Sequence, residues 1–153
     1  MQLSPLTAIS SVDGRYAGRT ASLRGIFSEY GLIRYRVIVE IRWFQALTEC
    51  TDFPQLSPLD ETACAYLDGL IAGFDVEAAE RVKSIEATTN HDVKAVEYYL
   101  KGCFAQQGEL QNLSEFLHFA CTSEDINNLA YALMMADARA QVFLPVFAEL
   151  DTA

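Results

Sequence analysis

The sequence predicts an all-α fold, and three observations support that prediction. Apolar residues recur at three- and four-residue spacing through most of the 153-residue chain, which is the period of an amphipathic helix. No stretch shows the strict apolar–polar alternation of a half-buried strand. Residues that typically begin or end helices stand between the apolar repeats. With 51% hydrophobic residues, the chain is long and apolar enough to bury a core.

The N-terminal part is expected to form turns and then a long helical stretch. Pro5 and the pair Asp13-Gly14 are turn signals. Residues 23–47 then keep a helical spacing. Gly31 has low helix propensity, so we expect it to divide this stretch into two helices. Four apolar residues share one stripe and four charged residues lie off it: Ile33, Val37, Ile41 and Phe44, against Arg34, Arg36, Glu40 and Arg42.

Two further helices are predicted in the middle of the chain. Residues 54–58 contain two prolines and predict a linker, and residues 59–74 predict the next helix. Asp75 is a good N-cap for a helix that runs to about residue 86. Residues 88–90 (TTN) have low helix propensity and are expected to end it. The apolar repeats of these two helices are Leu59, Ala63, Leu67 and Leu70, then Val76, Ala79, Val82 and Ile85.

Three further helical segments are predicted in the last part of the chain. Asp92 is expected to cap a helix over residues 93–104, and residues 114–119 predict a short helical piece. Thr122 and Asp125 stand at the spacing of a capping box, so the last long helix is expected to start at Thr122. The apolar face of that helix is predicted to comprise Ile126, Leu129, Leu133 and Met134.

Pro145 lies inside the last apolar repeat, where a proline either kinks a helix or starts a new one. The helical pattern continues to the last residue without a cap or a polar tail. We therefore expect the chain to be part of a larger protein. Its cut helix bundle should leave an apolar face bare and favour self-association. That face would include Leu133, Val142, Phe143 and Phe147.

The charge composition argues against two classes of partner. The 21 acidic and 11 basic residues give a net charge of −10, which disfavours a nucleic-acid surface and an anionic membrane surface.

No apolar run reaches membrane-spanning length, and the first residues lack a signal peptide, so we expect a cytoplasmic protein. No two of the four cysteines have C-x-x-C spacing, and only two histidines are present. We therefore expect reduced cysteines in the core and no metal site.

Three short polar segments interrupt the apolar repeats: residues 13–16 (DGRY), 88–92 (TTNHD) and 122–125 (TSED). In the first, Arg15 offers a fork of donors that suits phosphate or carboxylate, and Tyr16 adds a hydroxyl and a stacking face. The alternative is that Arg15 caps a nearby carbonyl group and Tyr16 packs against the protein.

The second polar segment contains His91 between Asn90 and Asp92 at a predicted helix junction. Histidine exchanges protons near neutral pH, asparagine both donates and accepts hydrogen bonds, and aspartate can orient the ring. The alternative is that Asp92 is simply an N-cap and His91 a partly buried polar residue.

The third polar segment places two hydroxyls, Thr122 and Ser123, at a helix start, with His118 four residues earlier. Free backbone N–H groups at a helix start favour phosphate or carboxylate. The alternative is an N-cap followed by acids that complement the helix dipole.

The order and spacing of these segments resemble the adenylosuccinate lyase family. The similarity is found in residues 11–16 (SVDGRY), 23–31 (LRGIFSEYG), 88–98 (TTNHDVKAVEY) and 116–128 (FLHFACTSEDINN). The resemblance implies the helical fold of the fumarase/aspartase superfamily, a homotetramer and chemistry without a metal or organic cofactor. It implies cleavage of adenylosuccinate to AMP and fumarate, and of succinylaminoimidazole carboxamide ribotide, in purine biosynthesis.

The resemblance also implies roles for the matching residues. Arg15 and Tyr16 would contact the substrate, Asn90, His91 and Asp92 would line the site, and His91 would support proton transfer. Thr122 and Ser123 would bind a carboxylate or phosphate, and His118 would contact the phosphate. The family's principal acid lies in a Thr-His-Gly stretch and its base in a Ser-Ser-x-Met-Pro stretch, and neither occurs here. We therefore expect this chain alone to be inactive.

The resemblance divides the chain at residue 111. Residues 1–111 would form an N-terminal helical domain and residues 112–153 the start of the central helical bundle. Two alternatives stay open: a standalone helical binding module or pseudoenzyme remnant, and a related lyase that acts on argininosuccinate.

Overall fold

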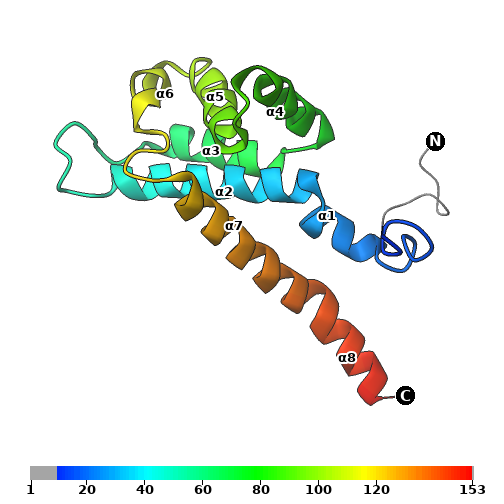
Figure 1. Ribbon diagram of the computed structural model, residues 1–153. Coiled ribbons are helices and arrows are strands. Elements are labelled where there is room, and N and C mark those ends of the chain that lie inside the picture. Colours follow the sequence, from blue (N-terminus) through cyan, green and yellow to red (C-terminus); the bar gives the residue numbers. More distant parts are fainter. Residues whose placement is uncertain (1–9, 153) are drawn as a thin grey trace.

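Helices form all the regular structure in residues 10–152, which are the residues that the computed structural model describes (Figure 1). The predicted all-α fold is confirmed for this part of the chain. The turn expected at Pro5 and the first residues, on which the absence of a signal peptide was judged, lie outside it. The helices are α1 (Arg24–Phe27), α2 (Glu29–Thr48), α3 (Glu61–Ala72), α4 (Val76–Thr89), α5 (Asp92–Phe104), α6 (Gly108–Asn112), α7 (Ser123–Ala138) and α8 (Leu144–Asp151).

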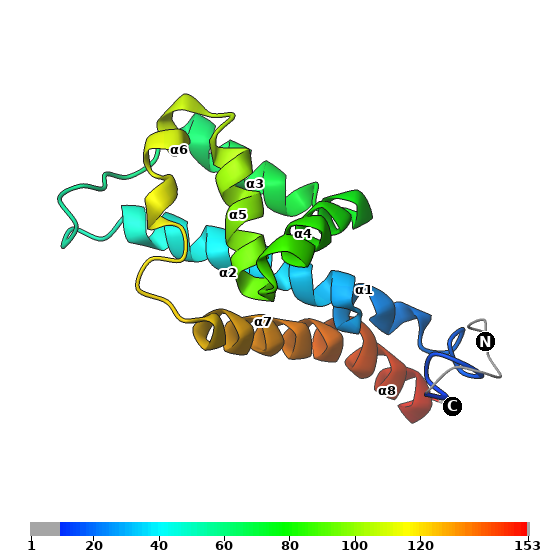
Figure 2. The same cartoon turned by 45° about the horizontal axis from the view of Figure 1, so that its top comes forward.

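Helix α2 is the centre of the fold. Helices α3, α4 and α5 pack on one side of it and α7 runs along another (Figures 1 and 2). The predicted stripe of α2 faces the first group, where it forms one core cluster with residues such as Leu67, Val82 and Leu100. Tyr35 and Val39 face α7 and form a second cluster there. Because α2 is covered on two sides, side chains between the two clusters are buried as well.

The break in the first helical stretch falls at Ser28, so the prediction of a break at Gly31 was wrong. Ser28 is extended (φ −75°, ψ 168°), and its hydroxyl caps α2 by accepting a hydrogen bond from the Gly31 N–H. Gly31 lies in the first turn of α2, where an added Cβ would collide with the backbone carbonyl of Ile26. The glycine is therefore required by the close approach of α1 to α2 and does not interrupt the helix.

The limits of α4 follow the predicted signals. The Asp75 carboxylate accepts from the Ala78 N–H at 2.8 Å, as an N-cap does. Asn90 ends the helix in the left-handed conformation (φ 52°, ψ 31°) that asparagine tolerates. Val76, predicted on the apolar repeat, is exposed because it occupies the first helical position.

Two predictions about the following helices were wrong in detail. His91, rather than Asp92, is the N-cap of α5, and Asp92 is its first residue. Residues 114–119 do not form one helical piece, because a 3₁₀ turn covers only Ser114–Phe116 and Leu117 is extended. The chain then makes a loop to α7 in which His118 and Ala120 both have φ of 59°. The capping box of Thr122 and Asp125 forms as predicted.

The C-terminal part continues from α7 through a π-helical turn, Arg139–Phe143, into α8. Pro145 lies in the first turn of α8, so of the two predicted outcomes, a kink or a new helix, the structure shows the start of a new helical segment. Helices α7 and α8 form an arm that extends away from the other helices (Figures 1 and 2). Within residues 10–152 no helix is both long and apolar enough to cross a bilayer.

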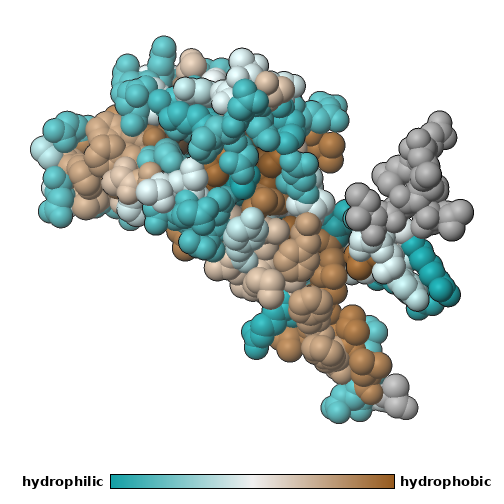
Figure 3. Space-filling model, in the orientation of Figure 1, coloured by the Kyte–Doolittle hydropathy of each residue, from teal (hydrophilic) through white to brown (hydrophobic). Residues whose placement is uncertain are grey.

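The apolar face predicted on α7 is divided between core and solvent. Ile126 and Met134 are buried, while Leu129 is 55% and Leu133 40% exposed. Figure 3 shows hydrophobic residues along the surface of the arm formed by α7 and α8. Of the face predicted to be bare, Leu133 and Phe147 are exposed, whereas Val142 and Phe143 are half-buried against the second cluster. Other large apolar residues exposed on the arm are Tyr131, Met135, Leu144, Val146 and Leu150.

Candidate functional site

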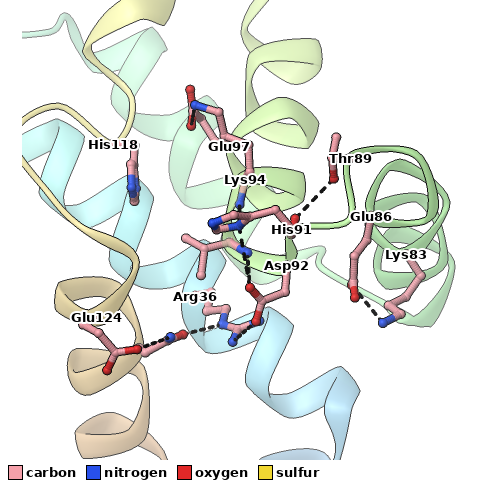
Figure 4. Close-up of polar contacts among 12 residues, drawn as sticks. Arg36, Lys83, Glu86, Thr89, His91, Asp92, Lys94, Glu97, His118 and Glu124 are labelled. Atoms are coloured by element: carbon pink, nitrogen blue, oxygen red, sulfur yellow. Dashed lines mark hydrogen bonds and ion pairs between the residues drawn. The ribbon is translucent and has the colours of Figure 1, made fainter.

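Arg36, a buried residue of α2, joins the second polar segment to α7, the helix that begins in the third polar segment (Figure 4). The Arg36 guanidinium donates to the Asp92 carboxylate at 2.6 Å and to the side-chain oxygen of Asn127 at 2.9 Å. Asp92 begins α5 and Asn127 lies one turn inside α7. One planar cation therefore sets the position of the α5 start relative to the α7 start.

Asp92 is held in its charged form. Its carboxylate accepts from the Val93 N–H at 2.8 Å as well as from Arg36. Partial burial favours the neutral acid, but the Val93 N–H and the Arg36 cation outweigh it, so the pKa of Asp92 is lowered. Asp92 is thus a fixed negative group that anchors the second polar segment.

His91 is placed at the surface with one ring nitrogen occupied. Its Nδ1 accepts from the Lys94 N–H at 3.2 Å, which caps α5, and the side chain is 51% exposed. Because Nδ1 accepts, the neutral ring carries its proton on Nε2. His91 therefore offers an N–H donor at Nε2. Asn90, in its left-handed conformation, precedes it and is also exposed.

Thr122 and Ser123 occupy the start of the 16-residue helix α7. The Thr122 hydroxyl and N–H both donate to the Asp125 carboxylate, at 2.8 and 2.7 Å. These two bonds lower the pKa of Asp125. The Thr122 hydroxyl oxygen also accepts from the Asp125 N–H at 3.4 Å, so Thr122 serves as the N-cap that the alternative interpretation describes. The Ser123 hydroxyl has no hydrogen-bond partner among residues 10–152, so ligand binding at this helix start stays a prediction for both residues.

His118 lies in the loop before α7 and contacts α2. Its Nδ1 lies 2.7 Å from Oε1 of Glu40, whose side chain is completely buried. The histidine side chain keeps 19% of its surface exposed. His118 is therefore close to the third polar segment in the chain and fixed to the same helix as Arg36.

The first polar segment is separate from the other two. Arg15 and Tyr16 are exposed, and the guanidinium lies 5.4 Å from the centre of the tyrosine ring. Figures 1 and 2 place this turn beyond α1, away from the start of α5. A cleft of about 640 Å³ lies beside it and is lined in part by Asp13, Arg24 and Glu29. Within this chain, Arg15 and Tyr16 do not meet His91 or Thr122.

Sequence reasoning missed Arg36 and Glu40 as parts of the site. Both were placed off the apolar stripe of α2, where charged side chains are usually exposed. They are 5% and 0% exposed, because α7 and the loop before it cover this face of α2. The available signal was their spacing of four residues, which puts both on one face of a helix.

The described part of the chain gives no metal centre. No group of three or more histidine, cysteine, aspartate or glutamate side chains in residues 10–152 is arranged to hold a metal ion. All four cysteines are free and half-buried.

Comparison with known proteins decides the family. The model of a protein family described as lyase matches residues 14–153. The chain belongs to this lyase family. The resemblance noted from the polar segments is confirmed by individual relatives of the same kind. Two bacterial adenylosuccinate lyases, from Haemophilus influenzae and Escherichia coli K12, are 54% and 55% identical to it over 150 residues.

These matches cover almost all of this lyase-family chain but only part of each relative. The alignments with the H. influenzae and E. coli proteins take in 98% of this chain and 33% of each relative. The adenylosuccinate lyase of Buchnera aphidicola subsp. Acyrthosiphon pisum is 45% identical over 147 residues, with 96% and 32% covered. The chain spans about a third of the length of the relatives it matches.

Proposed function

We propose that this chain is the N-terminal third of an adenylosuccinate lyase. The observation that supports this most strongly is the identity of 54–55% to two adenylosuccinate lyases over 98% of the chain. The whole protein would eliminate fumarate from adenylosuccinate to give AMP. It would also eliminate fumarate from succinylaminoimidazole carboxamide ribotide, by general acid–base elimination in purine biosynthesis.

The proposed contribution of this chain is substrate binding. Elimination requires removal of a proton from the carbon next to a carboxylate, so negative charge develops on that carboxylate. Donors at the α7 start, Thr122 and Ser123, would bind a carboxylate of the succinyl group or phosphate, and His118 would contact the phosphate. His91 would donate from Nε2 and support proton transfer to the leaving nitrogen. Asn90 and Asp92 would line the site beside it.

Arg15 and Tyr16 are proposed to contact substrate in a site that this chain shares with the rest of the protein. The separation of the turn at residues 13–16 from the start of α5 in Figures 1 and 2 supports a site assembled from more than one part. The principal acid and base would lie in those other parts. The 153-residue chain alone should therefore release no fumarate.

Residues 1–111 are proposed to form the N-terminal domain, and residues 112–153 to begin a central helical bundle. The exposed apolar residues of α7 and α8, such as Leu129 and Phe147, support this division, because they need a partner to be buried (Figure 3). We propose that the partners are further bundle helices and that the whole protein is a cytoplasmic homotetramer. Neither nucleic acid nor a membrane would take part.

The proposal is tested by extending the reading frame and assaying the product. The frame after codon 153 should encode a Thr-His-Gly stretch and a Ser-Ser-x-Met-Pro stretch. The whole protein, purified without added metal, should release AMP and fumarate from adenylosuccinate in equal amounts. Release of fumarate from argininosuccinate instead would identify a related lyase. A stop codon directly after codon 153 would identify a binding module or a pseudoenzyme remnant.

A further inference from the structure

A fully buried carboxylate lies beneath the loop that contains His118. Glu40 has no exposed surface, and its Oε2 has no hydrogen-bond partner within residues 10–152. Its Oε1 lies 2.7 Å from Nδ1 of the His118 ring. Burial raises the pKa of the Glu40 carboxyl, and the His118 contact opposes that rise. A buried carboxylate without a lysine or arginine partner is unfavourable for stability, so its presence calls for another explanation.

The loop is fixed to α2 at two points. Glu40 binds the His118 ring, and one turn further along α2 the Trp43 indole N–H donates to the Phe119 carbonyl oxygen at 2.8 Å. His118 and Ala120 both have φ of 59°, a conformation that residues other than glycine adopt at a cost. The two contacts with α2 therefore hold the loop in one strained conformation, and one of them is made by the His118 ring.

The contact with Glu40 determines which ring nitrogen is available to a ligand. When Glu40 is ionised, its carboxylate only accepts, so His118 donates to it from Nδ1–H and Nε2 is left for another partner. The opposite holds for His91, whose Nδ1 accepts from the Lys94 N–H. If His118 binds an anionic oxygen through Nε2, its ring must be doubly protonated, and the Glu40 carboxylate balances that charge. Two other acids, Glu97 of α5 and Asp125 of α7, interact electrostatically with Glu40 and His118, respectively.

We propose that Glu40 is a positioning residue that acts through His118. It fixes the orientation of the ring and balances the charge of its doubly protonated form, so that the Nε2–H is presented to an anionic oxygen of the substrate. This inference deepens the proposed function and rests on it.

A double-mutant cycle in the whole enzyme tests this inference, with kcat/KM for adenylosuccinate as the readout. Glu40→Gln keeps the size of the side chain and removes its charge. It should lower kcat/KM by about 10- to 100-fold, by analogy with residues that orient a metal-binding histidine through its second ring nitrogen. In a His118→Gln background the same substitution should change kcat/KM less than about twofold, because its effect passes through the ring. A merely structural residue would lower activity by the same factor in both backgrounds.

Glu97→Gln is the matched control. Glu97 is another buried carboxylate, but it pairs with Lys94 and Lys101 rather than with a histidine. Because Glu97 does not contact the ring, its replacement should be coupled to His118→Gln much less than the replacement of Glu40. Thermal unfolding of each variant identifies loss of folded protein. If Glu40→Gln does not fold, Glu40→Asp replaces it in the cycle. The shorter side chain keeps the negative charge but moves it away from Nδ1 of His118, so its effect should show the same coupling to His118→Gln.

The outcomes separate this inference from the proposed function. If the unmodified enzyme cleaves adenylosuccinate and the losses at Glu40 and His118 multiply, the positioning role is wrong and the proposed function stands. If Glu40→Gln retains full activity, the positioning role is also wrong. If the unmodified enzyme does not cleave adenylosuccinate, both are overturned.

Discussion

The buried guanidinium of Arg36 donates to the carboxylate of Asp92 at 2.6 Å, which ties the middle of α2 to the first residue of α5 (Figure 4). The same guanidinium donates to Asn127 of α7. Three helices that are distant in sequence therefore share one cation. His91 directly precedes Asp92, and α7 begins with Ser123. The two Arg36 contacts therefore position the starts of α5 and α7, which are both proposed to bind substrate.

Loss of the Arg36 contacts should destabilise the chain. Arg36→Met keeps much of the side-chain volume but leaves Asp92 and Asn127 without their donor. We expect the free energy of unfolding, measured with urea, to fall by about 2–3 kcal/mol, the scale of hydrogen bonds to charged groups. Arg42→Met is the control, because Arg42 and its partner Asp68 are each more than half exposed. That substitution should change stability by no more than about 0.5 kcal/mol. Equal effects of the two substitutions would contradict the role given to Arg36.

Asp92 should make stability depend on pH in the acid range. Its pKa in the folded chain is lowered from 3.8, so the folded state binds its proton less tightly than the unfolded state. Its contribution is therefore present above pH 3.8 and is lost as pH falls through the folded pKa. Unfolding at a series of pH values should show the advantage of the wild type over Asp92→Asn shrinking from about pH 5 downward. An advantage that stays constant across this range would show that Asp92 does not titrate as described.

Gly31 should not tolerate a side chain, although it lies in a helix. An alanine Cβ would collide with the Ile26 carbonyl, so Gly31→Ala should destabilise the chain by about 1–3 kcal/mol. Gly102 in α5 is the matched control, because an added Cβ meets nothing within 4 Å there. Gly102→Ala should stabilise by about 0.5–1 kcal/mol, the helix-propensity difference. Thermal unfolding distinguishes the two, and stabilisation by Gly31→Ala would refute the close approach.

The apolar surface of the α7–α8 arm should cause self-association of the 153-residue chain. Leu129 and Phe147 are 55% and 62% exposed, and burying such residues between chains is favourable. Sedimentation should show the average mass rising with concentration, and Leu129→Lys together with Phe147→Lys should suppress the rise. Val76→Lys is the control, because Val76 is 58% exposed but lies on α4, outside the arm. A monodisperse monomer at high concentration would contradict this prediction.

Features set by neighbouring residues could be predicted from the sequence. The stripe of α2, the Asp75 cap and the capping box of Thr122 each depend on spacing within a few residues, and all three are confirmed. The break between α1 and α2 was placed three residues too late, because glycine in a helix signals either a weak position or a close contact. Sequence alone does not distinguish these two cases, because the distinction depends on how closely the packed backbones approach each other.

Features set by packing could not be predicted. Arg36 and Glu40 are buried because α7 and the loop before it return to cover α2, a contact between residues that are 91 and 78 positions apart in the chain. The role of Thr122 was also ambiguous, because its hydroxyl suits a ligand and an N-cap equally well. In the structure this hydroxyl forms the cap, and a contact with a ligand stays a prediction. Residues 13–16 resembled a site segment, yet they lie apart from the other two segments within this chain.

The most direct test of the account is kcat/KM for adenylosuccinate in the whole protein carrying His91→Asn. Asparagine is as good an N-cap as histidine or better, so the start of α5 and its contact with Arg36 should survive while the imidazole is removed. We predict that the variant folds normally and that kcat/KM falls by about 100-fold or more, as expected for a group that supports proton transfer. A folded His91→Asn variant with unchanged kcat/KM would contradict the claim that this chain contributes His91 to the substrate site.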